Sequence, residues 1–236
     1  MQTAIICAAP SDNVTALLGV LPFWLSLTAL NAHAPAASDE SAPTVRTWIE
    51  GTGLHLAATY GRAGDGCARV VVLEVTALQR PGERRSPYHD HDMALFLHST
   101  AQHGGLEELL LDGVRLGPAS AAELRRGLPA MHALWRLGLS NTGSCLCDVA
   151  PGIAHLTALE NLHLGHIKAR HGDGGRFAQQ LGQMHRLRVL SVTCCNLGEA
   201  GWRAVLCEAS KLPRLHTLSL DSSQLEMDGV WGRLAE

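Results

Sequence analysis

The sequence predicts an α/β fold built from repeated units, each with one β-strand followed by one α-helix. Leucine-rich runs recur at nearly constant spacing, and within each unit the period of apolar residues changes from two to about 3.6. Hydrophobic residues make up 46% of the chain but aromatic ones only 4%, so the core must consist mainly of Leu, Val and Ala. This composition favours regular layers over a pocket lined with aromatic rings.

Five strand-like runs define the repeat. Each has an aliphatic residue at its first, fourth and sixth positions, and the leucines that open the runs are 28, 25, 28 and 28 residues apart. Alternation with period two is typical of a strand with one buried face. The opening leucines are Leu106, Leu134, Leu159, Leu187 and Leu215.

The second half of each unit predicts a helix. Its apolar residues are four and three positions apart, which places them on one helical face. The short second unit keeps this spacing, so its three missing residues come from the turn before the helix. The predicted helix-face residues are Leu124, Leu128, Met131, Val149, Ile153, Leu156, Phe177, Leu181, Met184, Val205, Ala209 and Leu212.

An earlier unit precedes these five. The run that begins at Val70 fits the strand template, and a helix is expected over about 92–102, with Asp92 as its N-cap. The polar, proline-bearing insertion RPGERRSPYHDHD lies between them. The segment that begins at Thr47 is interpreted as the strand-like start of the folded part.

This pattern resembles the leucine-rich repeat family, and within it the ribonuclease-inhibitor-like class, whose long units carry a full helix and a glycine in the turn, as in NLGEAGWRAVL. The resemblance covers roughly residues 70–236 and implies a horseshoe-shaped solenoid, with parallel strands on the concave face and helices on the convex face. The family usually carries Asn or Cys at position nine. None of the five units here has Asn at that position, so no continuous asparagine ladder is expected. Position nine is occupied by Val114, Thr142, Ile167, Cys195 and Ser223.

The seven cysteines do not describe a disulfide scaffold, because their number is odd. Reduced thiols in a reducing compartment are the simplest interpretation. Cys195 is expected to pack as a small buried apolar residue, whereas Cys194 has no assignable role. Cys145 and Cys147, taken with His155, lack the paired spacing of a zinc site. No metal and no cofactor are therefore expected.

Other candidate chemistry is sparse. His89 and His91 could share a metal on an extended segment, but a solvated loop is the favoured interpretation. The chain contains no GxxxxGK[ST], HExxH or GxSxG, and the glycine-rich HGDGG lies in a repeat turn. No catalytic residue is expected, and the protein is predicted not to be an enzyme.

The side chains between the strand leucines are expected to face the hollow of the solenoid. They are small, polar and mildly acidic, and the net charge is −3, so nucleic acid is not an expected partner. Trp135 is expected near the edge of the hollow, whereas Trp202 and Trp231 belong to the helical side. The residues predicted to contact a partner are Glu74, Thr76, Glu108, Leu110, Asp112, Arg136, Ser140, Asn161, His163, Val189, Ser191, Thr193, Thr217, Ser219 and Asp221.

The sequence divides into an N-terminal segment over 1–45 and a repeat domain of about five to six units over 46–236. Three interpretations of the uncharged run 14–30 stay open: a helix that caps the first unit, a cleaved secretory signal, or a membrane span. At the other end no polar capping unit follows the last helix. Leu220, Trp231 and Leu234 are therefore expected to be partly exposed and available for association.

The predicted function is that of a non-enzymatic interaction module in the cytoplasm, which binds another protein through the concave face. One alternative is a regulatory or substrate-recruiting part of an enzyme assembly, such as a ubiquitin ligase or a GTPase regulator. Another is a secreted recognition protein, or one anchored at the surface through residues 14–30. The fold alone names no partner.

Overall fold

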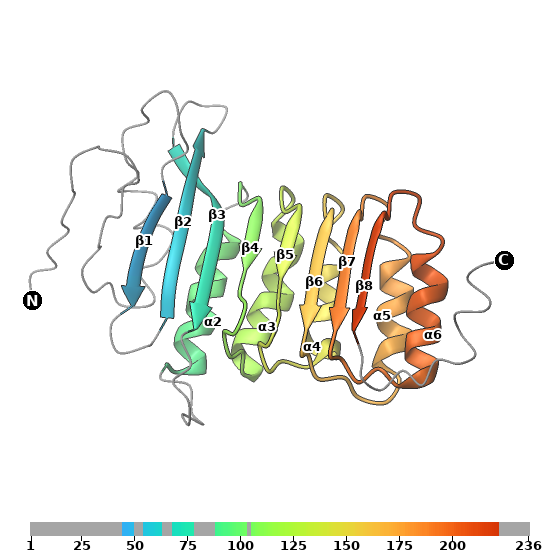
Figure 1. Ribbon diagram of the computed structural model, residues 1–236. Coiled ribbons are helices and arrows are strands. Elements are labelled where there is room, and N and C mark those ends of the chain that lie inside the picture. The colour runs from blue at the N-terminus through green and yellow to red at the C-terminus, as the bar shows by residue number, and fades with distance from the viewer. Residues whose placement is uncertain (1–43, 50–53, 63–67, 78–87, 103–104, 222–236) are drawn as a thin grey trace, which may run out of the picture.

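A computed structural model describes residues 44–49, 54–62, 68–77, 88–102 and 105–221. Its strands form one eight-stranded sheet in which spatial order follows chain order from β1 to β8. The strands from β3 onward are parallel, and the five helices of the described residues cover one face of the sheet (Figure 1). The predicted α/β class is therefore confirmed.

The six parallel strands align one leucine each in a single column, and the first five of these leucines are buried. Leu73, Leu109, Leu137, Leu162 and Leu190 are each 0% exposed, and the pairing registers align them with one another and with Leu218. Leu218, in the last strand, is 39% exposed. The strands are β3 (Ala68–Ala77), β4 (Glu108–Leu110), β5 (Arg136–Gly138), β6 (Asn161–Gly165), β7 (Val189–Thr193) and β8 (Thr217–Asp221).

One helix follows each strand from β3 to β7, as the change of period predicts. All twelve predicted helix-face residues are buried, the most exposed at 7%. The helices are α2 (Asp90–Ala101), α3 (Pro118–Gly127) with the 3₁₀ turn η1 (Leu128–Ala130), α4 (Leu146–Ile153), α5 (Asp173–Leu181) and α6 (Gly198–Ala209). None of the described helices is long and apolar enough to cross a membrane.

The prediction that Asp92 caps α2 is wrong. The helix begins at Asp90 with His89 at the N-cap, so Asp92 lies inside the first turn. There its negative charge still interacts favourably with the positive end of the helix dipole. The carboxylate of Asp90 instead caps the neighbouring α3, where it accepts hydrogen bonds from the backbone N–H groups of Gly117, Ala119 and Ser120.

The strand-like start expected near Thr47 proves to be two antiparallel strands, β1 (Thr44–Ile49) and β2 (Leu54–Arg62), paired alongside β3. They extend the sheet beyond its first parallel strand. The side chain of Tyr60 is almost fully buried here, and this burial raises the pKa of its phenol to about 12. The run 14–30, for which three interpretations were open, lies outside the described residues.

The turns after β4, β5, β6 and β7 each use a left-handed residue at position eight of the unit. Gly113 has φ 77°, Asn141 57°, His166 51° and Cys194 51°. Glycine adopts this conformation readily, and asparagine and histidine tolerate it, whereas cysteine is strained in it. Cys194, to which the sequence assigned no role, therefore occupies a conformationally demanding turn position.

Glycines permit close approach between helices on the covered face. A Cβ atom on Gly174 of α5 would lie 2.6 Å from the Cα atom of Gly201 in α6, too close for any side chain. Large side chains fill the space deeper between the helices, and Trp202 is buried as predicted for the helical side. Trp231 lies outside the described residues.

Candidate functional site

The face of the sheet opposite the helices brings the predicted partner-contacting residues together. We call these residues, together with Val72, Gly138 and Gly165, the open face. Strand pairing aligns one row of Val72, Glu108, Arg136, Asn161, Val189 and Thr217. It aligns a second row of Glu74, Leu110, Gly138, His163, Ser191 and Ser219.

The third row lies at the carboxyl ends of the strands. Gly165 and Thr193 are in register with Asp221, whose side chain lies outside the described part. On the neighbouring units the backbone N–H of Ser140 donates to Oδ1 of Asp112 at 2.8 Å. Thr76 completes the row on β3 and is partly buried. These residues therefore lie along one face of the sheet, and their contact with a partner stays a prediction.

The charged groups of the open face gather around β4 to β6. Nη1 of Arg136 lies 3.3 Å from Oε2 of Glu108, and both side chains keep contact with solvent. A pair of this kind contributes at most about 1 kcal/mol to stability. Nε of Arg136 is buried and has no acceptor among the described residues. The guanidinium is therefore incompletely satisfied within the part of the chain that the structure describes.

His163 lies beside these charges. Its partial burial lowers the pKa of the imidazole, the positive charge of Arg136 lowers it further, and Asp112 acts in the opposite direction. The net effect favours the neutral ring at neutral pH. A neutral imidazole can both donate and accept a hydrogen bond, which suits it to a polar contact with a ligand.

Position two, immediately before the first open-face residue of each unit, carries side chains that the sequence analysis did not assign to a site. Nε of Arg188 lies 3.3 Å from Oε2 of Glu160, the residue at the same position of the preceding unit. Trp135 also occupies this position and is half-buried. The sequence contained a pattern that could have identified this position, because position two carries a large or charged residue in all five units.

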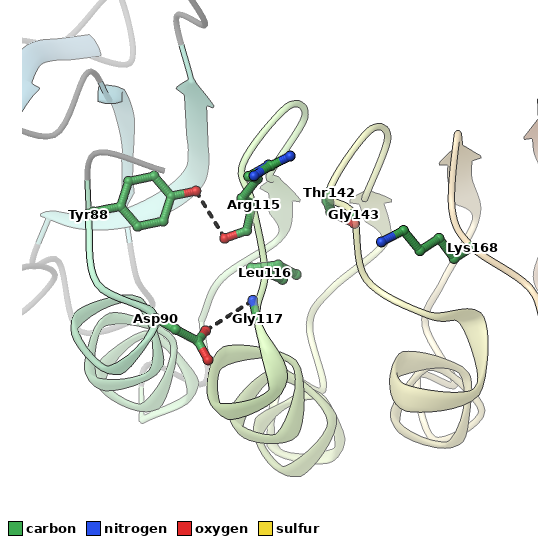
Figure 2. Close-up of a pocket in the computed structure, with 8 residues that line it drawn as sticks. All are labelled: Tyr88, Asp90, Arg115, Leu116, Gly117, Thr142, Gly143 and Lys168. Atoms are coloured by element: carbon green, nitrogen blue, oxygen red, sulfur yellow. Dashed lines mark hydrogen bonds between the residues drawn. The ribbon is translucent and has the colours of Figure 1, made fainter. Parts of the chain in front are cut away.

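A recess of about 330 Å³ opens at the turns that follow the strands (Figure 2). The hydroxyl of Tyr88 donates to the backbone oxygen of Arg115 at 3.0 Å, and this contact joins the α2 unit to the next turn. Lys168 extends toward Gly143 from the unit beyond. The lining residues are Tyr88, Asp90, Arg115, Leu116, Gly117, Thr142, Gly143 and Lys168.

The carboxylate of Asp90, the negative group in this recess, already accepts hydrogen bonds from α3. Burial raises the pKa of Asp90, but its hydrogen bonds to the Ser120 hydroxyl and to the backbone of α3 outweigh that effect and lower the pKa overall. The carboxylate therefore stays ionised and serves as the cap of α3. The exposed Arg115 and Lys168 make the rim of the recess suitable for an acidic group. The sequence analysis did not identify this recess.

Cys195 has the structural role that the sequence predicts. It is 4% exposed, and its thiol points at the backbone oxygen atoms of Leu164 and Thr193. Burial raises the pKa of this thiol, which keeps it protonated and unreactive.

Cys145 and Cys147 do not lie with His155, which is exposed just after α4. They lie instead with Asp173 of the next unit, and the ligand atoms of all three are within 4.8 Å of one another. Burial, a hydrogen bond with Cys145 and the nearby negative charges raise the pKa of the Cys147 thiol to about 12. His89 and His91 belong to no such group of three within the described residues.

No protein-family model matches this chain, and no curated protein matches it. The assignment of a function therefore depends on the arrangement of its own residues.

Proposed function

We propose that this protein is a non-enzymatic interaction module of the leucine-rich repeat type, and that its open face binds another protein. The observation that carries the proposal is the register of β3 to β8, which aligns mostly polar side chains in rows while the leucines between them are buried from β3 to β7. Such a surface is built by the scaffold and requires no further rearrangement to receive a partner.

The proposed shape is a solenoid with the strands on its inner wall. Neighbouring strands lie about 4.8 Å apart, whereas packed helices need about 8–10 Å between their axes. A stack with strands on one side and helices on the other therefore curves toward the strands. The close glycine contact between α5 and α6 reduces this difference at that pair of helices.

The chemistry of the open face favours a protein over other ligands. Six parallel strands at about 4.8 Å spacing span about 24 Å, enough for a helix or an extended segment of a partner. Nε of Arg136 has no acceptor in the described part of the chain, and a carboxylate or backbone oxygen of the partner would supply one. Acidic Glu74, Glu108 and Asp112 disfavour phosphate-rich nucleic acid.

The proposed compartment is the cytoplasm. Five cysteines of the described part, Cys145, Cys147, Cys194, Cys195 and Cys207, are free thiols. Free thiols on the surface, such as those of Cys194 and Cys207, persist in a reducing environment.

Charge reversal on the open face tests the proposal. The variant Arg136→Glu/His163→Glu is compared with a control variant, Arg125→Glu/Gln179→Glu. The control alters exposed residues of α3 and α5, two of the helices that cover the other face of the sheet. Partners captured by the intact protein are identified by mass spectrometry, and their affinities are measured with each purified variant. We expect the open-face variant to lose at least about tenfold in affinity and the control to bind normally. Equal binding by both variants would overturn the proposal.

A further inference from the structure

We propose that Cys145, Cys147 and Asp173 bind one zinc ion through two sulfur atoms and one carboxylate oxygen. Cys145 is the N-cap of α4, Cys147 lies in the first turn of that helix, and Asp173 is the first residue of α5. The stacking of two neighbouring units brings them together across 28 residues of sequence. This inference is independent of what the open face binds.

The distances suit a tetrahedral ion. Sγ of Cys145 lies 3.5 Å from Oδ2 of Asp173 and 3.1 Å from Sγ of Cys147. Zinc–sulfur bonds of about 2.3 Å and a zinc–oxygen bond of about 2.0 Å at tetrahedral angles require separations of about 3.5 Å and about 3.8 Å. The first is met as it stands, and the second requires the two thiols to move apart by about 0.7 Å. Side-chain rotation of the less buried Cys147 can supply that movement.

Burial provides the second argument. Asp173 is 4% exposed, and Oδ2 accepts a hydrogen bond of 2.7 Å from the backbone N–H of Arg170. Within the described residues this carboxylate has no ion-pair partner, although a buried charge needs either a counter-charge or a metal. A zinc ion would neutralise it, and the Arg170 N–H would hold it in the orientation that ligation requires.

The chemistry of the ligands favours zinc over other common ions. Calcium and magnesium take oxygen ligands, whereas two thiolates with one carboxylate suit a borderline-soft ion. Oδ1 of Asp148 lies 3.6 Å from Sγ of Cys147 and adds to the negative potential. Binding converts two thiols to thiolates and releases two protons, and a water molecule reaching the site past the partly exposed Cys147 completes the four ligands.

The test uses the full chain, reduced and stripped of metal, and titrates it with zinc or with cobalt as a spectroscopic probe. We expect one equivalent of zinc to bind, and cobalt to produce thiolate charge-transfer absorption together with visible bands of tetrahedral intensity. Cys145→Ser, Cys147→Ser and Asp173→Asn should each weaken zinc binding by at least about tenfold. Cys194→Ser and Cys207→Ser, which alter exposed thiols elsewhere, should bind zinc as the intact chain does.

A second readout on the intact chain does not depend on the folding of any variant. Zinc added to the reduced, metal-free chain should release two protons per bound ion into a weakly buffered solution, and zinc should raise the melting temperature of the chain until a chelator removes it. Three results would overturn the proposal: unchanged affinity in the three ligand variants, no proton release on addition of zinc, or conversion of the two thiols to a disulfide with no zinc bound in the reduced protein.

Discussion

Truncation of the leucine column at Leu162 should destabilise the protein far more than the same change at Leu218. Leu162 is 0% exposed and lies between Leu137 and Leu190 in the register of the sheet, so Leu162→Ala leaves a closed cavity. Such a substitution costs about 3–4 kcal/mol from lost burial and unfilled volume. Leu218 is 39% exposed, so its loss forfeits less burial and leaves no enclosed void, at about 1 kcal/mol.

Urea denaturation followed by circular dichroism measures these differences as changes in the free energy of unfolding. Leu95→Ala is the matched control, because Leu95 is 42% exposed on α2 and alanine favours the helix. We expect a change within about 0.5 kcal/mol for this control. If Leu162→Ala and Leu218→Ala cost the same, the stacked column does not carry the stability that we assign to it.

Three further predictions concern individual contacts. Cys194→Gly should raise the free energy of unfolding by about 0.5–1 kcal/mol, because relief of the strained left-handed φ of 51° exceeds the entropic cost of glycine. A lower melting temperature of the variant in thermal denaturation would contradict this. Gly174→Ala should lower the free energy of unfolding by about 1–3 kcal/mol, since the new Cβ atom would collide with Gly201. An unchanged free energy of unfolding in chemical denaturation would contradict this contact. Asp90→Asn should cost about 1 kcal/mol at neutral pH through the weakened cap of α3. Because the pKa of Asp90 is lowered in the folded state, its contribution is complete above the ordinary carboxyl pKa of about 3.9 and is lost as the pH falls below it. The difference in stability between intact protein and variant should therefore shrink in acid, and a difference that grows in acid would contradict the assignment.

The regular features of the fold could be predicted from sequence because each unit repeats the same burial problem. Leucines at every second position bury one side of a strand, and apolar residues four and three apart bury one side of a helix. Alignment of the leucine template from one unit to the next then predicts the register, so the residues of the open face could be identified without coordinates. The short second unit did not disturb this, because its deletion falls in the turn before α4.

The features that escaped prediction depend on contacts between units at irregular positions. Asp90 caps α3 instead of its own helix, and Asp173 meets Cys145 across a turn whose length differs from that of its neighbours. Neither contact follows a period, so the spacing of residues contains no signal for it. The antiparallel pairing of β2 with β3 was missed for a related reason, since the strands before the first repeat do not share its pattern.

Site-specific photo-crosslinking tests the central claim most directly. A photoreactive residue is placed at Ser191, on the open face of β7, or at Gln179, exposed on α5, and each protein is irradiated with the captured partner. Our account predicts a covalent adduct from position 191 and none from position 179. Adducts formed from position 179 alone would show that the partner binds the helices and would contradict the account.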